Sequence, residues 1–200
     1  KRTLMPDGDY SKEQIRRFAA ELGLQVADKP DSLDICFVPD GDYASFIEKT
    51  TGKKIPGGNF VTPEGKILGR HRGIIHYTVG QRKGLGLALG YPAFVLEIRP
   101  ETNEVVIGTY EESLTRVLKA DQLNFMAVSD LKEPRRVFAK IRYNHKGAWC
   151  TVEKTGEDEI TCVFEDPIRA VTPGQAVVLY DGEYVLGGGT IRRQFQEELV

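Results

Sequence analysis

From about residue 60 onward the sequence is a succession of short segments in which apolar and polar residues alternate, separated by turns that contain glycine or proline. This period of two is typical of β-strands with one buried face, and the short connections favour antiparallel neighbours. Many short antiparallel strands predict a small barrel or a sandwich. The expected strands are 59–62, 66–70, 93–99, 104–108, 135–143, 148–154, 159–164, 176–180 and 184–186. Two hairpins are predicted at Pro63-Glu64-Gly65 and Pro100-Glu101-Thr102-Asn103, and Asp181-Gly182 is a further hairpin turn.

Two helices are expected before the strands. Ser11 and Gln14 form a capping box pattern, and Gly23 is well placed to end the helix that follows. Asp42 is positioned to cap a second, shorter helix that ends near Gly52. The fold class is therefore mainly β with a small α+β N-terminal part, in which a small central domain is followed by a C-terminal antiparallel β-barrel. We place the boundary in the polar segment near residue 112, giving domains over 1–112 and 113–200.

Composition limits the class of protein. The 200 residues are 40% hydrophobic and 28% charged, which is ordinary for a soluble globular protein. No apolar run approaches the roughly 20 residues that cross a bilayer, and the first residues do not resemble a signal peptide. Only three cysteines are present, which favours a reducing compartment, so we expect a cytoplasmic protein with no membrane partner. A capped helix is expected almost at the start of the chain, after a few residues with no obvious partner. We therefore expect the chain to be a piece of a longer protein.

Charge is distributed unevenly although the net charge is only −2. Residues 66–96 contain five lysines and arginines and no carboxylate. Residues 132–148 contain six lysines and arginines and a single carboxylate, Glu133. Two interpretations stay open at this point. The segments are either solvated faces or a surface that follows the phosphates of a nucleic acid.

The three cysteines differ in their surroundings. Cys36 lies in a short β-type run between turn residues, so it is either a buried structural thiol or a reachable nucleophile. Cys150 and Cys162 lie in strand patterns and are expected to pack in the core. No pair has Cys-x-x-Cys spacing and only three histidines exist, so we expect no metal site.

Two basic segments could bind RNA. Glycines at 80, 84 and 86 surround Arg82 and Lys83, in a loop that matches neither a Walker sequence nor a dinucleotide fingerprint. Arg142 and Tyr143 end a strand and combine a phosphate-binding cation with an aromatic ring on which a base can stack. The competing interpretations are a basic loop without a ligand and an edge strand whose charges discourage aggregation.

Four strings together resemble the bacterial tRNA-specific 2-thiouridylases, over nearly the whole chain. The resemblance depends on four strings: Pro30-Asp31-Ser32 with Asp34-Ile35-Cys36-Phe37, Tyr77-Thr78-Val79-Gly80-Gln81-Arg82-Lys83-Gly84-Leu85-Gly86, Ala170-Val171-Thr172-Pro173-Gly174-Gln175 and Leu186-Gly187-Gly188-Gly189. It implies an N-terminal ATP pyrophosphatase domain, a small central domain and a barrel like the second domain of elongation factor Tu. This chain resembles the central and barrel parts only, so the ATP site is expected to lie outside it and the chain alone is expected to be inactive.

The resemblance also implies residue roles. Cys36 would carry a persulfide that delivers sulfur to the wobble uridine of a tRNA anticodon, with ATP as the cosubstrate of the full-length enzyme. Arg142, Tyr143 and Gln175 match tRNA-contacting positions, and Arg82 and Lys83 are expected to help. The expected partners are tRNA and a persulfide donor protein, and we expect a monomer. The alternative is a non-catalytic RNA-binding barrel module.

Overall fold

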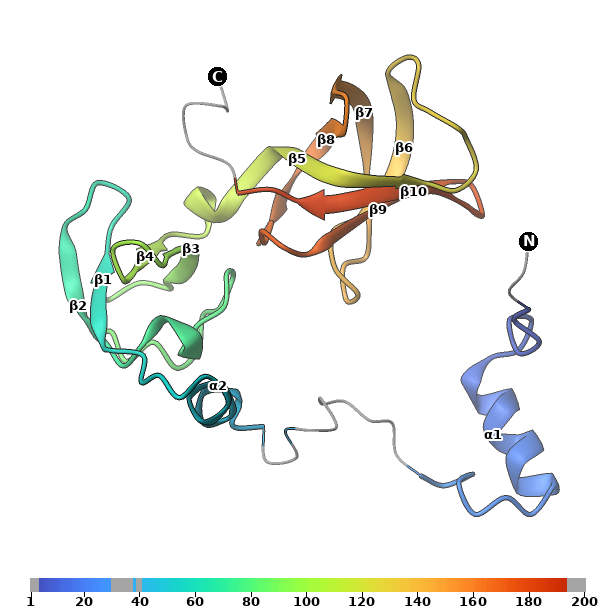
Figure 1. The fold of residues 1–200 in the computed structure, drawn as a ribbon, viewed down its shortest axis with the longest axis horizontal. Helices are drawn as coiled ribbons and strands as arrows, with labels where there is room; N and C mark the ends of the chain where they lie inside the picture. The colour runs from blue at the N-terminus through green and yellow to red at the C-terminus, as the bar shows by residue number, and fades with distance from the viewer. Residues whose placement is uncertain (1–3, 30–37, 39–40, 194–200) are drawn as a thin grey trace. The chain divides into compact units, whose positions relative to one another are not determined.

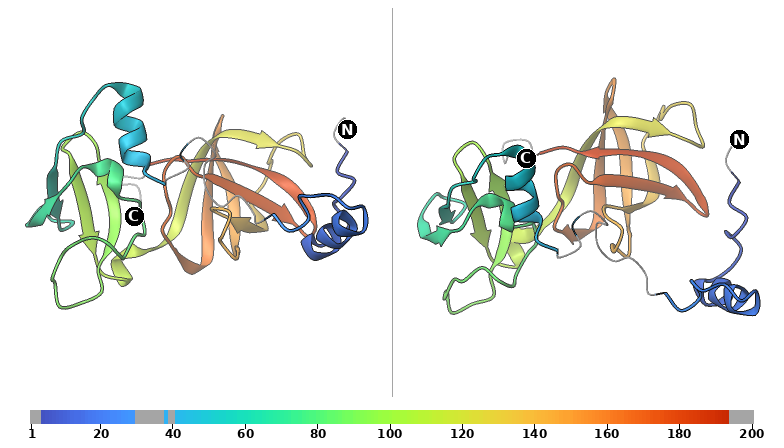
Figure 2. Two further views of the ribbon diagram at one scale, coloured as in Figure 1. Left: turned by 90° about the horizontal axis from the view of Figure 1, so that it is seen from below. Right: turned by 60° about the horizontal axis from the view of Figure 1, so that its bottom comes forward.

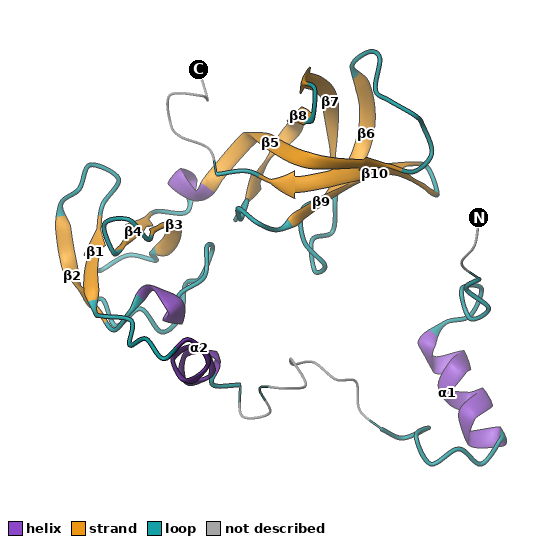
Figure 3. Cartoon of the chain, viewed as in Figure 1, coloured by secondary structure: helices purple, strands orange, loops and turns teal. Residues whose placement is uncertain are grey.

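The structure is a computed structural model of the chain and describes residues 4–29, 38 and 41–193. It divides into two compact units, residues 1–51 and residues 52–200. Strands dominate the second unit, and helices are short throughout (Figure 3). Among the described residues no helix has the length and apolar character needed to cross a membrane.

Both helices of the first unit begin where the sequence predicts. In α1 (Lys12–Glu21) the Ser11 side chain accepts from the Gln14 N–H, and the Gln14 side chain accepts from the Ser11 N–H, so the capping box is confirmed. Gly23 follows with a φ of 67°, which glycine adopts without steric cost. Before α2 (Tyr43–Thr51), the Asp42 carboxylate accepts from the Ser45 N–H at 3.1 Å.

The second unit begins with a four-stranded sheet in the order β2-β1-β4-β3. Its strands are β1 (Gly58–Val61), β2 (Ile67–His71), β3 (Phe94–Arg99) and β4 (Glu104–Gly108). The two predicted hairpins are confirmed, because β1 pairs with β2 and β3 with β4 in antiparallel register. The hairpins join through a parallel β1–β4 pair. Short 3₁₀ helices lie at Ile74–His76 and Glu111–Ser113.

One face of this sheet packs into a small core of Phe60, Tyr77, Val95, Val105 and Ile107. His71 is also buried, and it acts as a fixed structural link. Its Nδ1 accepts from the N–H groups of Gly58 (3.3 Å) and Gly73 (3.1 Å), so Nε2 carries the proton and donates to the Asn103 carbonyl at 3.2 Å.

Six strands close into an antiparallel barrel in the order β10-β5-β8-β7-β6-β9, which Figures 1 and 2 show curling around one interior. The predicted barrel is therefore confirmed. Its strands are β5 (Leu114–Phe125), β6 (Arg135–Lys140), β7 (Ala148–Gly156), β8 (Glu159–Arg169), β9 (Ala176–Asp181) and β10 (Tyr184–Ile191). Alternate side chains of every strand point inward to form the core, among them Leu118, Val137, Cys150, Val152, Cys162, Phe164, Leu179 and Leu186.

One expectation about the barrel is corrected. The longest strand, β5, is absent from the strands predicted above, where its start was taken for the polar connection between domains. Three consecutive glycines indicate either a tight bend or a close backbone approach. Gly187–Gly189 lie inside β10, which favours the close approach. A Cβ on Gly188 would lie 2.1 Å from the Val177 carbonyl oxygen, so the glycine allows β9 and β10 to approach closely.

Contacts also connect the sheet to the barrel within this unit. Arg193, which follows β10, donates to the carboxylates of Glu97 (2.7 Å) and Glu101 (3.0 Å). The guanidinium of Arg169, at the end of β8, lies 5.0 Å from the ring centroid of Phe94. The basic loop of the sheet and the basic loops of the barrel are thus parts of one compact unit.

Candidate nucleic-acid interface

The segment after β6 presents Arg142 and Tyr143. Ile141 is buried and anchors the segment in the barrel core, and the His145 N–H closes the turn by donating to the Arg142 carbonyl at 3.1 Å. This turn leaves the Tyr143 side chain 96% exposed. A base can stack on this exposed ring without displacing contacts within the fold, so Tyr143 is suited to base stacking.

Arg142 is held in place by backbone carbonyls at the end of β8. Its Nη1 donates to the carbonyl oxygens of Arg169 (3.0 Å) and Ala170 (3.1 Å). Burial lowers the pKa of the Arg142 guanidinium, and the nearby charge of Arg169 lowers it further. No carboxylate among the described residues forms an ion pair with either arginine, so the two neighbouring positive charges have no direct ionic partner there.

Gln175 lies on the loop that follows Ala170. The Gln175 N–H donates to the Thr172 carbonyl at 3.2 Å, and the Gln175 carbonyl accepts from the Ile191 N–H at 2.8 Å. Its exposed side chain therefore projects from a fixed backbone. The Thr172 hydroxyl also donates to the Ala170 carbonyl, the same atom that accepts from Arg142.

Arg82 and Lys83 lie on the loop between the 3₁₀ helix and β3, and both side chains are exposed. Gln81 shapes this loop, because its side chain accepts from the Thr78 N–H (3.0 Å) and donates to the Lys83 carbonyl (2.9 Å). A Cβ on Gly80 would lie 2.4 Å from the Cβ of Ala170, so this loop packs directly against the barrel loop.

Ala170 is therefore the meeting point of the predicted RNA-binding segments. Ala170 begins the loop of Gln175, and it contacts the loop of Arg82 through Gly80 and the turn of Arg142 through its carbonyl, although these three segments lie far apart in the sequence. We call these three segments, residues 80–86, 141–147 and 170–175, the Ala170 loops. Ala170 itself has a φ of 56°, an uncommon conformation for a residue with a Cβ.

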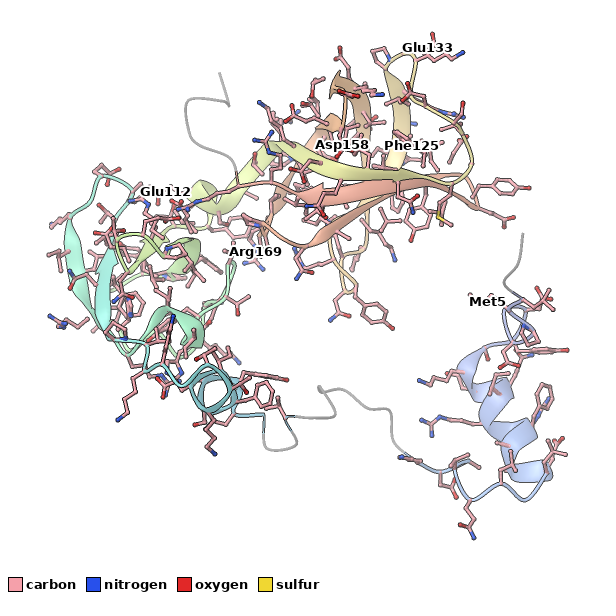
Figure 4. The ribbon with its side chains drawn as sticks, in the orientation of Figure 1. Met5, Glu112, Phe125, Glu133, Asp158 and Arg169 are labelled. Carbon is pink, nitrogen blue, oxygen red and sulfur yellow. The ribbon has the colours of Figure 1, made fainter. Side chains whose placement is uncertain are left out.

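A pocket of about 480 Å³ opens beside the Ala170 loops. Arg142 and Arg169 lie on its wall, and Figure 4 labels Arg169 where β8 ends. The pocket is lined by Tyr110, Leu114, Phe138, Arg142, His145, Gly147, Ala148, Trp149, Glu165, Asp166, Pro167, Ile168 and Arg169.

The cysteines are distributed as follows. Cys150 and Cys162 are fully buried in the barrel core, as predicted. A hydrogen bond with Cys150 and burial raise the pKa of the Cys162 thiol well above its ordinary value, so this thiol is a poor nucleophile. Cys36 lies outside the described residues, and its assignment as the reactive cysteine stays a prediction.

Sequence reasoning missed Arg169, Trp149 and His145 as candidate binding residues. Trp149 was treated as part of a strand that packs in the sheet, yet it is 42% exposed and lines the pocket. Its alternation with the buried Cys150 was the available signal, since neighbours in a strand point to opposite faces. Nothing in the sequence pattern indicated that Arg169 approaches Arg142.

Three family models match the chain in succession. A tRNA methyl transferase HUP domain matches residues 1–40, a tRNA methyl transferase PRC-barrel domain matches 44–109, and an aminomethyltransferase beta-barrel domain matches 115–191. The last two matches coincide with the four-stranded sheet and the closed barrel. The first falls on residues that we placed in the central domain, and the division at residues 112 and 113 stays a prediction.

Relatives match along almost the whole chain. The tRNA-specific 2-thiouridylase MnmA of Lachnoclostridium phytofermentans is 64% identical over 95% of the chain, and that of Acetivibrio thermocellus is 55% identical over 96%. The protein of the same name from Koribacter versatilis is 52% identical over 95%. The chain spans about half the length of these relatives, 53%, 54% and 53% respectively. The chain belongs to the tRNA-specific 2-thiouridylase family.

Proposed function

We propose that this chain supplies the tRNA-binding surface and the sulfur-carrying cysteine of a tRNA-uridine 2-sulfurtransferase. The observation that carries the RNA-binding part is the convergence of the Ala170 loops, which gathers exposed cations and an exposed tyrosine on one compact unit. Phosphate contacts position an RNA, and aromatic rings hold its unpaired bases. The names of the relatives, which specify thiolation of tRNA, support the same assignment.

The proposed sulfur step uses Cys36 as a persulfide, R–S–S⁻. The terminal sulfur attacks C2 of a uridine whose C2 oxygen has been converted into a leaving group, and the C2–O bond breaks. A second cysteine, which we place outside this chain, then attacks the Cys36 sulfur. A disulfide forms, the persulfide S–S bond breaks, and its electron pair remains on the sulfur bound to C2. A thiol reductant and a persulfide donor protein reset the enzyme.

ATP is the expected activator of the uridine oxygen in the full-length enzyme. The sequence contains no glycine-rich loop that ends in Gly-Lys-Ser or Gly-Lys-Thr. We propose that ATP binds outside these residues. We also propose that the protein acts as a cytoplasmic monomer.

The RNA-binding part is tested by measuring tRNA binding to the chain in a filter assay. Tyr143→Ala is expected to weaken binding about tenfold, because it removes one base-stacking ring without disturbing the fold. Tyr184→Ala is the matched control, since Tyr184 is also an exposed aromatic (75%) but lies at the β9–β10 turn. Equal losses for both variants, or no loss for Tyr143→Ala, would count against the proposed surface.

The sulfur-carrying part is tested by identifying the cysteine that accepts sulfur. After brief incubation with a persulfide donor, peptide mass mapping is expected to find the additional sulfur on Cys36 and not on the buried Cys150 or Cys162. Cys36→Ser should abolish the modification, whereas Cys150→Ser should leave it unchanged. Modification of all three cysteines at equal rates, or of none, would favour the non-catalytic RNA-binding module.

A further inference from the structure

We infer that the pocket beside the Ala170 loops holds a single unpaired nucleotide of the bound RNA, with the phosphate at Arg142 and Arg169 and the base against Trp149. This inference rests on the proposed tRNA binding and adds a defined subsite to it. The pocket volume of about 480 Å³ lies in the range of small-molecule sites, and its walls supply both charged groups and aromatic surface.

The cationic side of the pocket is formed by two guanidinium groups. Arg142 is fixed by the carbonyls of Arg169 and Ala170, and its other N–H groups have no partner in the part of the chain that the structure describes. Arg169 lies over the rings of Phe94 (5.0 Å) and Tyr110 (5.7 Å). Two neighbouring positive charges that form no ion pair among the described residues are stabilised by an anion, and arginine binds phosphate oxygens through its forked donors.

The aromatic side is formed by Trp149 and its neighbours. Arg136 lies 4.0 Å from the Trp149 ring centroid, and Phe138 packs against Trp149 edge-on at 5.5 Å. Arg136 is itself held by Glu165, which accepts from its Nε at 2.6 Å. The indole is thereby fixed in position but remains 42% exposed, so a base can stack on it without a large loss of side-chain entropy.

Two further polar groups line the pocket. His145 makes no side-chain hydrogen bond among the described residues, and its Nδ1 is buried. Burial lowers the pKa of His145, and the charges of Arg142 and Lys140 lower it further, so the ring is neutral at pH 7. Asp166 lines the pocket as well and offers acceptor oxygens. A carboxylate repels a phosphate but accepts from the amino or imino group of a base, so we expect Asp166 to contact the base of the bound nucleotide.

Trp149 is the single tryptophan of the chain, so its fluorescence reports directly on this pocket. Titration with tRNA or with a short single-stranded RNA is expected to quench the emission in a saturable manner. A duplex RNA of the same length should bind with little quenching, because its bases are already stacked. Nucleoside monophosphates at high concentration should also quench, whereas ribose 5-phosphate should not.

Variants separate this inference from the proposed function. Trp149→Leu and Arg169→Ala are each expected to weaken tRNA binding about tenfold in the filter assay. Arg116→Ala, which removes an exposed charge of the same barrel outside the pocket lining, should change it by less than about twofold. Circular dichroism verifies that each variant is folded.

The outcomes are distinguishable. If tRNA binds to the chain but leaves the Trp149 emission unchanged, and Trp149→Leu binds normally, the nucleotide pocket is wrong while the tRNA-binding surface stands. If tRNA does not bind in the filter assay at all, the proposed function itself is contradicted. Equal quenching by duplex and single-stranded RNA would show that the pocket does not select an unpaired base.

Discussion

At the scale of single residues, the fold depends on polar side chains that make hydrogen bonds inside the protein. His71 is the clearest case, because its two ring nitrogens link Gly58 and Gly73 to Asn103. Only the neutral ring with its proton on Nε2 can make all three hydrogen bonds. Burial is the main cause that lowers the His71 pKa, and the nearby charge of Arg70 adds to it.

His71 therefore predicts a loss of stability in acid. Its pKa is lower in the folded protein than in the unfolded chain, so the unfolded chain binds the proton more readily. The stability from neutral His71 is complete above the ordinary pKa of about 6.5 and is lost as the pH falls below it. Thermal unfolding at pH 7.5 and 5.5 measures this loss of stability. His71→Gln should be less stable at both values but show a smaller pH dependence, and an unchanged dependence would contradict this role.

The candidate site was only partly predictable at this scale. Arg142, Tyr143, Gln175, Arg82 and Lys83 were identified from the combination of charge, aromatic character and the family resemblance. That they meet around Ala170 was not predictable, because the contacts of Ala170 join residues about 30 and 90 positions apart in the chain. Local pattern carries information on which groups are present, whereas their convergence depends on the tertiary fold.

At the scale of secondary-structure elements, the sequence was most informative where turns and alternation agree. The hairpin β1–β2 was predicted because Pro63-Glu64-Gly65 separates two alternating segments. The strand β5 was missed because its first residues, Leu114 to Val117, are partly exposed and pass through a bulge opposite β8. The alternation is therefore weak at the start of β5, which follows the four-stranded sheet along the chain.

The three glycines of β10 lead to a prediction about the barrel. At Gly188 a Cβ would meet the Val177 carbonyl at 2.1 Å, so Gly188→Ala is expected to destabilise the protein by about 2–4 kcal/mol. Gly182→Ala is the matched control, because Gly182 has a φ of 59° but nothing within 4 Å of an added Cβ. It should cost only about 1–2 kcal/mol. Urea unfolding compares them, and a smaller cost at Gly188 than at Gly182 would contradict the close approach.

At the scale of the whole molecule, a nearly neutral chain presents a locally positive surface. The net charge is −2, so overall attraction cannot account for the proposed RNA binding. The exposed Arg82 and Lys83 make no ion pair among the described residues, in contrast to Arg135 and Arg136, which pair with Asp181 and Glu165. Cations without partners are the ones that release counterions from a nucleic acid most effectively.

The salt dependence of tRNA affinity tests the central claim, that the Ala170 loops form one phosphate-binding surface. The logarithm of the affinity should fall linearly with the logarithm of the salt concentration. The double variant Arg82→Ala/Lys83→Ala should reduce that slope by about 2, while Arg116→Ala leaves it unchanged. A wild-type affinity that does not depend on salt, or an identical slope in the double variant, would contradict the account.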